Sequence, residues 1–148
     1  MLNRLRWAVL VAALLLTFTV SHGASGSPEV VAGTASGDGP MPRATVKAIF
    51  FGTLTRWDSG RPIVVYVLPA DHPTSKNFAW NILRVTPYSF EERISSMVAT
   101  RDGNAPRVVQ TESEMLRAVN STPNSIGYLS SFVVINNAHS NIRVIPVL

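Results

Sequence analysis

The side chains most capable of chemistry are grouped in one short segment of the sequence, 71–75. It contains a carboxylate from Asp71, an imidazole from His72, and the hydroxyls of Thr74 and Ser75. Groups of these types can ligate a metal, take part in hydrolysis or cap the start of a helix. Their spacing, and the elements on either side of them, decide among these roles.

A metal site would need His72 to meet His139 and a carboxylate such as Asp71. The two histidines lie far apart and no ligand spacing joins them. A hydrolase would need an exposed nucleophile, and the sequence lacks the Gly-x-Ser-x-Gly turn that presents one. It also contains no cysteine, which excludes thiol catalysis and thiolate ligands. We therefore expect no enzymatic activity, no metal and no cofactor.

The polar segment lies between a predicted strand and a predicted helix. Ile63–Leu68 is continuously apolar and rich in β-branched residues, which is typical of a central strand covered on both faces. Pro73 is suited to the first turn of a helix, which is predicted to run to about Val85. Judged from the residues alone, the polar side chains around Pro73 simply cap this helix.

The remaining elements are predicted from apolar spacing and from two S/T-x-x-E capping patterns, at Ser89 and Thr111. The predicted helices are Pro42–Phe51, closed by Gly52, Phe90–Val98 and Glu112–Val119. The predicted strands are Arg107–Val109, Ile126–Leu129, Phe132–Ile135 and Ile142–Val147. Strands that alternate with helices indicate an α/β layer structure rather than a helical bundle or a sandwich of sheets.

The N-terminus has the three parts of a secretory signal. Arg4 and Arg6 precede the apolar run Trp7–Val20, after which small residues occur. The run is shorter than the roughly 20 residues that span a bilayer. We therefore expect export to the periplasm, with cleavage after Gly23 or Ala24, and no membrane insertion after cleavage.

The stretch 24–42 differs in composition from residues 43–148, because it is rich in Gly, Ser and Pro. Within it, only Glu29–Ala32 is predicted to form a strand, at an edge of the sheet. The predicted organisation is a signal peptide over 1–23, a flexible N-terminal arm over 24–42 and a periplasmic-binding-protein-like domain over 43–148.

The charge distribution argues against nucleic acid as a partner. Two of the thirteen Lys and Arg residues lie in the predicted signal, which leaves eleven basic and nine acidic residues, a net charge of +2. The eleven basic residues are scattered singly along the chain. Nucleic-acid binding requires a basic patch or stripe, so we do not expect it.

Two motifs carry a resemblance to a known family. The first is Ile49–Trp57, IFFGTLTRW, and the second is Pro123–Tyr128, PNSIGY. With the strand and the helix start at Thr74, they make the segment from about Thr45 to Leu148 similar to small phosphate-binding components of ABC transporters. The resemblance implies a PstS-like member of the type II periplasmic binding protein superfamily. Its fold is α/β, a single lobe with a central mixed sheet flanked by helices, whereas full members have two lobes.

The resemblance also gives the polar segment a role. In this family, phosphate is held on backbone amides and hydroxyls at a helix N-terminus, in a Gly-Ser-Gly-Thr-like loop that comes after an Arg. The loop aligns with residues 68–75 of this chain. The resemblance therefore implies a ligand site for phosphate or another small anion, formed by Thr74 and Ser75 with His72 and Asp71.

This loop is altered relative to the family pattern. Leu68 stands in place of the Arg, Asp71 and Pro73 replace glycines, and His72 replaces the Ser. Pro73 removes one amide donor, and an ionised Asp71 repels an anion. Since hydrogen bonds to charged groups contribute about 1.5–3 kcal/mol each, these changes are expected to weaken anion binding by several kcal/mol.

Two functions stay open from the sequence. The first is an exported, non-enzymatic solute-binding-like protein that resembles the phosphate-binding components of ABC transporters and takes a small anion at Thr74 and Ser75. The second is a degenerate member without a ligand, which acts as an interaction or assembly protein in the envelope. A single lobe leaves one wall of a cleft exposed, and that surface favours a homodimer or a protein partner.

Overall fold

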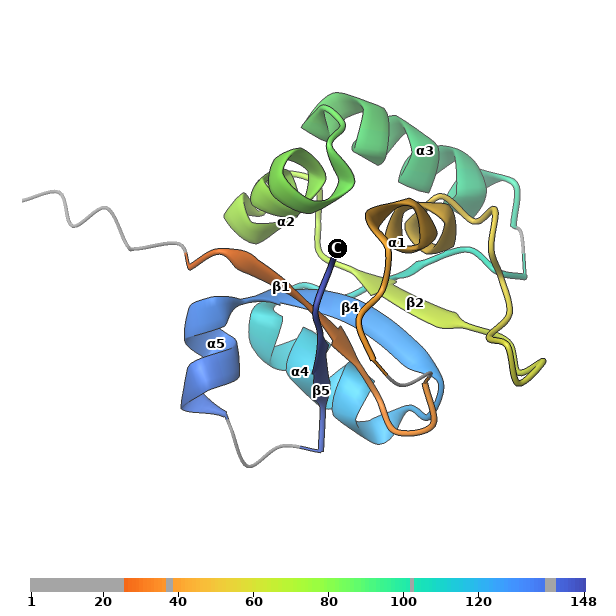
Figure 1. Ribbon diagram of the computed structural model, residues 1–148. Helices are drawn as coiled ribbons and strands as arrows, with labels where there is room; N and C mark the ends of the chain where they lie inside the picture. The colour runs from red at the N-terminus through yellow and green to blue at the C-terminus, as the bar shows by residue number, and fades with distance from the viewer. Residues whose placement is uncertain (1–25, 37–38, 102, 138–140) are drawn as a thin grey trace, which may run out of the picture.

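The computed structural model describes residues 26–36, 39–101, 103–137 and 141–148 (Figure 1). The predicted signal peptide lies outside these residues. The strands are β1 Pro28–Ala32, β2 Val64–Val67, β3 Arg107–Val108, β4 Ser125–Ser130 and β5 Arg143–Ile145. The helices are α1 Arg43–Phe50, α2 Pro73–Phe78, the π-helical turn η1 Ala79–Leu83, α3 Pro87–Ala99, α4 Glu112–Ser121 and α5 Ser131–Asn136. No helix in the described segments is long and apolar enough to cross a membrane.

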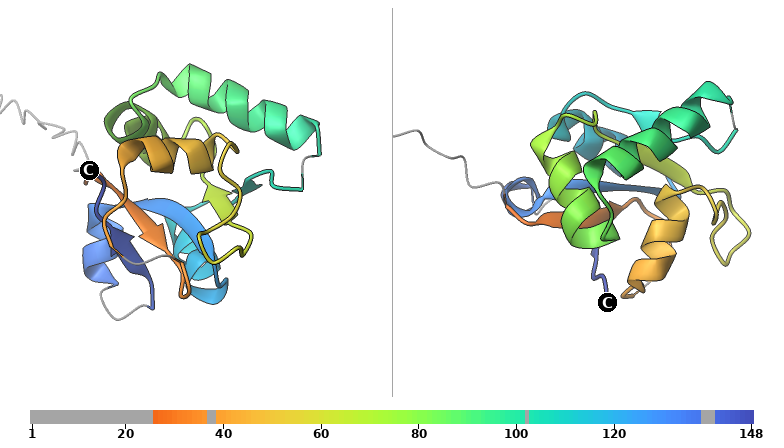
Figure 2. Two further views of the ribbon diagram at one scale, coloured as in Figure 1. Left: turned by 45° about the vertical axis from the view of Figure 1, so that its right-hand side comes forward. Right: turned by 90° about the horizontal axis from the view of Figure 1, so that it is seen from above.

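The strands form one five-stranded mixed sheet in the order β3-β2-β4-β1-β5. Strand β2 is parallel to both of its neighbours, while β1 is antiparallel to β4 and β5. Helices α1, α2 and α3 cover one face of the sheet, and α4 and α5 cover the other (Figures 1 and 2). The expected α/β lobe, with a central mixed sheet between helices, is therefore confirmed.

Strand β1 corrects the expectation of a flexible arm over 24–42. Val30 pairs with Tyr128 on one side and with Ile145 on the other, so the strand lies inside the sheet and not at its edge. Val31 and Ala32 are fully buried. The domain therefore begins before residue 43, because a short apolar strand surrounded by Gly, Ser and Pro completes the sheet through partners about a hundred residues away.

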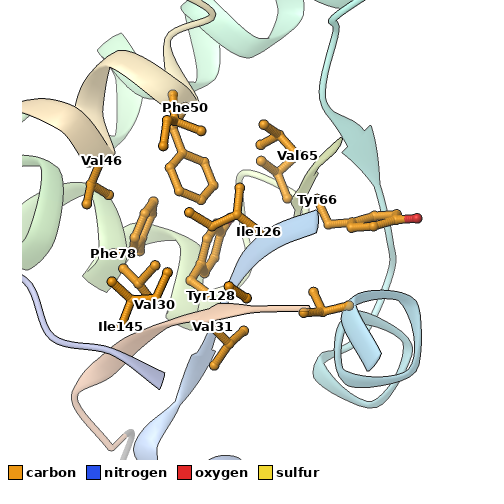
Figure 3. Close-up of a cluster of buried hydrophobic side chains, with 14 of the residues drawn as sticks. Val30, Val31, Val46, Phe50, Val65, Tyr66, Phe78, Ile126, Tyr128 and Ile145 are labelled. Atoms are coloured by element: carbon orange, nitrogen blue, oxygen red, sulfur yellow. The ribbon is translucent and has the colours of Figure 1, made fainter. Parts of the chain in front are cut away.

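An aromatic cluster fills the core on the side of α1 and α2 (Figure 3). The ring of Phe78 stacks on that of Tyr128 at a centroid distance of 4.0 Å, and Phe50 meets Phe78 edge-on at 4.8 Å. Phe50 lies on the buried face of α1. The predicted closure of that helix by Gly52 is confirmed, since Gly52 has a φ of +71°. These rings join α1, α2 and β4.

The two motifs of the family resemblance meet in space. The indole N–H of Trp57 donates to the carbonyl oxygen of Asn124 at 3.0 Å, and the backbone N–H of Val64 donates to the same oxygen at 3.1 Å. Trp57 is buried, whereas Trp80 is half exposed. The corner after α1 is thereby attached to the turn that leads into β4.

The strand predicted over Phe132–Ile135 is wrong, because this segment forms α5. Its β-branched, apolar sequence favours a strand locally, but β propensity depends strongly on packing context. Here the side-chain amides of Asn136 and Asn137 donate back to the carbonyls of Phe132 and Val133, at 2.8 and 2.9 Å, and satisfy the last turn of a helix. Phe132 and Ile135 remain 66% and 73% exposed.

Two predicted helix boundaries also move. Helix α3 begins at Pro87 because the hydroxyl of Thr86, rather than that of Ser89, caps it, accepting from the backbone N–H of Ser89 at 3.1 Å. The helix predicted over 73–85 divides into α2 and η1. It ends at Arg84, whose left-handed φ of 55° is incompatible with continuation of the helix.

The substitution Gly33→Ala tests whether the segment after β1 is an integral part of the domain. A Cβ at Gly33 would lie 2.5 Å from the carbonyl oxygen of Thr122 and 2.7 Å from that of Val119. Because both contacts are backbone atoms, we expect a loss of about 1–3 kcal/mol in the free energy of unfolding by urea. The control is Gly103→Ala, where a Cβ meets nothing within 4 Å. Equal stability of the two variants would contradict this placement of β1.

Candidate functional site

The segment 71–75 lies at the carboxyl end of β2, between that strand and α2. Strand β4 is parallel to β2 and ends at the same edge of the sheet, where ligand sites of open α/β sheets are usually built. Thr74 and Ser75 are only 5% and 3% exposed, His72 is half-buried, and Asp71 is exposed. The two hydroxyls therefore face the interior, while the carboxylate of Asp71 faces solvent.

His72 caps α2, as its position alone suggests. Its Nδ1 accepts a hydrogen bond from the backbone N–H of Thr74 at 3.2 Å. Asp71 lies one residue further from the helix and is exposed. One of the amides that a bound anion would use at this position is thereby already satisfied within the chain.

Ser75 takes part in a buried network with Tyr128. The Ser75 hydroxyl and the Tyr128 hydroxyl are 2.9 Å apart, and the backbone N–H of Leu68 donates to the Tyr128 oxygen at 3.0 Å. Burial raises the pKa of Tyr128 from 10.0 to about 12, although the hydrogen bonds from Ser75 and Leu68 act in the opposite direction. The phenol is therefore neutral at physiological pH and links the loop after β2 to the aromatic core.

Thr74 contacts a carboxylate that the sequence did not single out. Its hydroxyl donates to Oε1 of Glu112 at 2.8 Å. The backbone N–H of Ser130 donates to the same oxygen at 2.8 Å, and the Ser130 hydroxyl donates to Oε2 at 3.0 Å. We call these three donors, from Thr74 and Ser130, the Glu112 cradle.

The cradle is assembled from the starts of three helices. Glu112 is the first residue of α4, Ser130 immediately precedes α5, and Thr74 is the second residue of α2. Hydrogen bonds to an ionised acceptor are the stronger ones, and a negative charge is favoured in the first turn of a helix. Hydroxyl and amide donors of the kind that the resemblance assigns to phosphate are therefore present, and they are bonded to a carboxylate of the chain itself.

Sequence reasoning missed Glu112 and Ser130 as site residues. The predicted capping pattern at the start of α4 is confirmed, since the Thr111 hydroxyl accepts from the backbone N–H of Glu114 at 3.1 Å. That pattern explained the start of the helix without giving any role to Glu112. The only signal was an acidic residue beside the cap, which is a common feature of helices.

A pocket of about 240 Å³ opens beside Ser75, between the loop after β2 and α3. Its walls come from the loop 68–70, from the first turns of α3 and from Val108 of β3. Among the described residues, no group of three or more His, Asp or Glu side chains could hold a metal. His139, the second histidine considered for a metal, lies outside the described residues.

The fold is similar to that of several solved structures of proteins related to phosphate transport. The chain is similar to PstS from Borrelia burgdorferi, with 15% identity, a TM-score of 0.60, and coverage of 82% of this chain and 47% of that one. A phosphate transport receptor from Vibrio cholerae matches with 21% identity, a TM-score of 0.55, and coverage of 82% and 46%. The chain has the fold of one lobe of a PstS-like protein.

A third similar structure, from Clostridium perfringens, contains bound phosphate and matches this lobe with 14% identity, a TM-score of 0.58, and coverage of 82% and 44%. The PstS-like lobe therefore spans less than half the length of each of these proteins. No family model and no curated protein matches the chain. At these identities the likeness establishes the fold, which is the lobe that the two sequence motifs predict.

The raised pKa of Tyr128 predicts an alkaline loss of stability. Because the folded value of about 12 lies above the ordinary value of 10.0, folding favours the neutral phenol. This contribution is fully present below pH 10 and is lost as the pH rises to about 12, by up to about 3 kcal/mol. Urea unfolding of the wild type and of Tyr128→Phe between pH 8 and 12 measures it. We expect the stability difference between them to shrink with pH, and a constant difference would contradict the assignment.

Proposed function

We propose that this chain is an exported, non-enzymatic solute-binding-like protein in which Glu112 occupies the anion position of a PstS-like lobe. The proposal rests on the Glu112 cradle, in which three donors at the carboxyl edge of the sheet bind a carboxylate that belongs to the chain itself. The wild-type protein consequently does not retain free phosphate at Thr74 and Ser75, the residues to which the resemblance points.

Displacement of Glu112 by phosphate is unfavourable for two reasons. First, the incoming anion must replace three hydrogen bonds to a charged group, each of which contributes about 1.5–3 kcal/mol. Second, the displaced carboxylate stays tethered at the start of α4, so it repels a second negative charge nearby. Leu68 supplies no charge to offset this repulsion at the position where the family pattern has an Arg.

The arrangement of polar groups supports a role without catalysis. A nucleophilic serine must be hydrogen-bonded to a general base. The Ser75 hydroxyl is instead bonded to Tyr128, and Nδ1 of His72 is bonded to the backbone of Thr74. Two of the solved proteins that share this fold are described as a phosphate transport receptor and as a putative substrate-binding protein of a phosphate transporter, which fits a protein that binds a ligand without transforming it.

Isothermal titration calorimetry with phosphate and with sulfate tests whether the carboxylate of Glu112 prevents anion binding. We expect no binding by the wild type and millimolar binding by Glu112→Ala, because that substitution frees the donors of Thr74 and Ser130. Glu114→Ala is the matched control, since Glu114 lies on the same helix and accepts from the backbone N–H of Gln110, outside the cradle. Should Glu112→Ala fail to fold, Glu112→Gln tests the charge alone: it removes the repulsion of phosphate while its amide oxygen still accepts from the donors, so its binding should lie between those of the wild type and Glu112→Ala. Phosphate binding by the wild type that is lost in Thr74→Val would disprove the proposal.

A second candidate function, an interaction or assembly protein in the envelope, is favoured by the surface of α5. Phe132 and Ile135 lie one turn apart on this helix and are 66% and 73% exposed. Exposed apolar side chains that lie together often mark a protein interface. This surface lies on the face of the sheet opposite to α3 (Figure 1), and Ser130 of the Glu112 cradle immediately precedes the helix.

Light scattering over a range of protein concentrations tests the second candidate. If α5 is an interface between two copies, the wild type is dimeric and the double variant Phe132→Ser, Ile135→Ser is monomeric. Tyr88→Ser is the matched control, because Tyr88 is 72% exposed but lies on α3. A wild type that stays monomeric at every concentration would rule out the homodimer.

A further inference from the structure

The pocket beside Ser75 is a second feature of the same sheet edge, and its chemistry differs from that of the Glu112 cradle. Its walls are mostly apolar. They come from Pro69 and Ala70 after β2, from Phe90 and Ile94 of α3, and from Val108 of β3. The polar side chains of the lining are Ser75, Glu91 and Ser95. A cavity with this lining favours a ligand whose body is apolar, because burial of apolar surface supplies most of the binding free energy.

The size of the pocket limits the ligand. Its volume of about 240 Å³ lies below the roughly 300–1,000 Å³ of sites that hold drug-sized molecules. The lining residues come from the loop after β2 and from three elements: α2, α3 and β3. A small molecule of a few carbon atoms fits this space.

The one charged side chain of the lining disfavours an anion. Of the lining residues, only Glu91 is ionisable, and it carries a negative charge. An anion in an apolar pocket needs a cationic or amide partner to compensate for its lost hydration, and Glu91 would repel it instead. A neutral or positively charged end group meets no such penalty, and a positive one is attracted by Glu91.

Ser75 gives the ligand one point of polar contact in the pocket. A hydroxyl can make one hydrogen bond as a donor and two as an acceptor. The Ser75 hydroxyl makes one of these with Tyr128. It therefore retains the capacity to bond a hydroxyl or amine of the ligand without breaking the network of the core.

We propose that this pocket binds a small molecule with an apolar body and a neutral or cationic end group. Such a molecule would be the solute of the solute-binding role proposed above, and its assignment rests on that role. The ligand would lie beside the Glu112 cradle without displacing the internal carboxylate, so the protein would be a receptor for an apolar solute on a fold shared with phosphate-binding proteins.

Three probes that share a six-carbon chain and differ in the end group test this proposal: hexan-1-ol, hexylammonium and hexanoate. Each is titrated into the isotopically labelled mature protein, and the shifts of backbone amide resonances are monitored by NMR. We expect hexan-1-ol and hexylammonium to shift the amides of Ala70, Ile94 and Val108, with dissociation constants on the order of millimolar. Hexanoate should bind at least about tenfold more weakly, because of Glu91.

Matched variants on α3 identify the site. Ile94→Trp fills the pocket and should abolish both interactions, whereas Val98→Trp, one turn further along the same helix and outside the lining, should leave them unchanged. Glu91→Gln should remove the preference for hexylammonium over hexanoate, and the adjacent Glu92→Gln should not. Circular dichroism of each variant verifies that it is folded.

Three results would overturn the proposal: no shift of these amides with any probe, equal binding of hexanoate and hexan-1-ol, or unchanged binding in Ile94→Trp. A phosphate titration monitored in the same spectra keeps the two proposals distinguishable. Phosphate-induced shifts at Thr74 and Ser130 in the wild type would disprove closure of the anion position by Glu112. Such shifts would not affect the test of the pocket, which depends on the shifts caused by the six-carbon probes.

Discussion

The half-buried carboxylate of Glu112 needs hydrogen-bond donors in place of the water that it loses, and this requirement organises the edge of the sheet where it lies. The three donors come from Thr74 and Ser130, so the same contact fixes the starts of α2, α4 and α5 relative to one another. Any ligand at this edge must either displace that carboxylate or bind beside it. In the function proposed above, the choice between an anion and another solute therefore depends on a contact within the protein.

The aromatic core supports the same edge from inside. Tyr128 stacks on Phe78 within the core, and its hydroxyl bonds to Ser75 and to the backbone N–H of Leu68. A single buried side chain thus holds both ends of the loop between β2 and α2. Because the phenol is neutral and fully buried, it orients the loop without adding charge. The position of Thr74 against Glu112 depends on this anchoring.

The sequence predicts those elements whose signals are local. The capping pattern at Thr111 and the apolar run around Val65 correspond to α4 and β2 in the structure. Two of the failures, β1 and Glu112, concern features with distant partners. Strand β1 is short and is flanked by Gly, Ser and Pro, so its sequence does not predict a central strand. Its central position follows from the pairing of Val30 with Tyr128 and Ile145, which are distant in the sequence. Glu112 likewise resembles an ordinary helix-start residue, because its role depends on Ser130, whose amide reaches it only after the sheet has formed.

The apolar residues at 68–70 have two effects on this edge of the sheet: they leave it without a cation and they form a wall of the pocket. At the position where the family resemblance places an Arg, Leu68 is 3% exposed and contributes to both the core and the pocket. Pro69 and Ala70, the next two residues, line the same pocket. An anion site needs cationic or amide donors along its wall, whereas Leu68, Pro69 and Ala70 offer the pocket apolar side chains. The residues that remove the expected cation therefore also supply the apolar surface, while Glu112 satisfies the donors that remain.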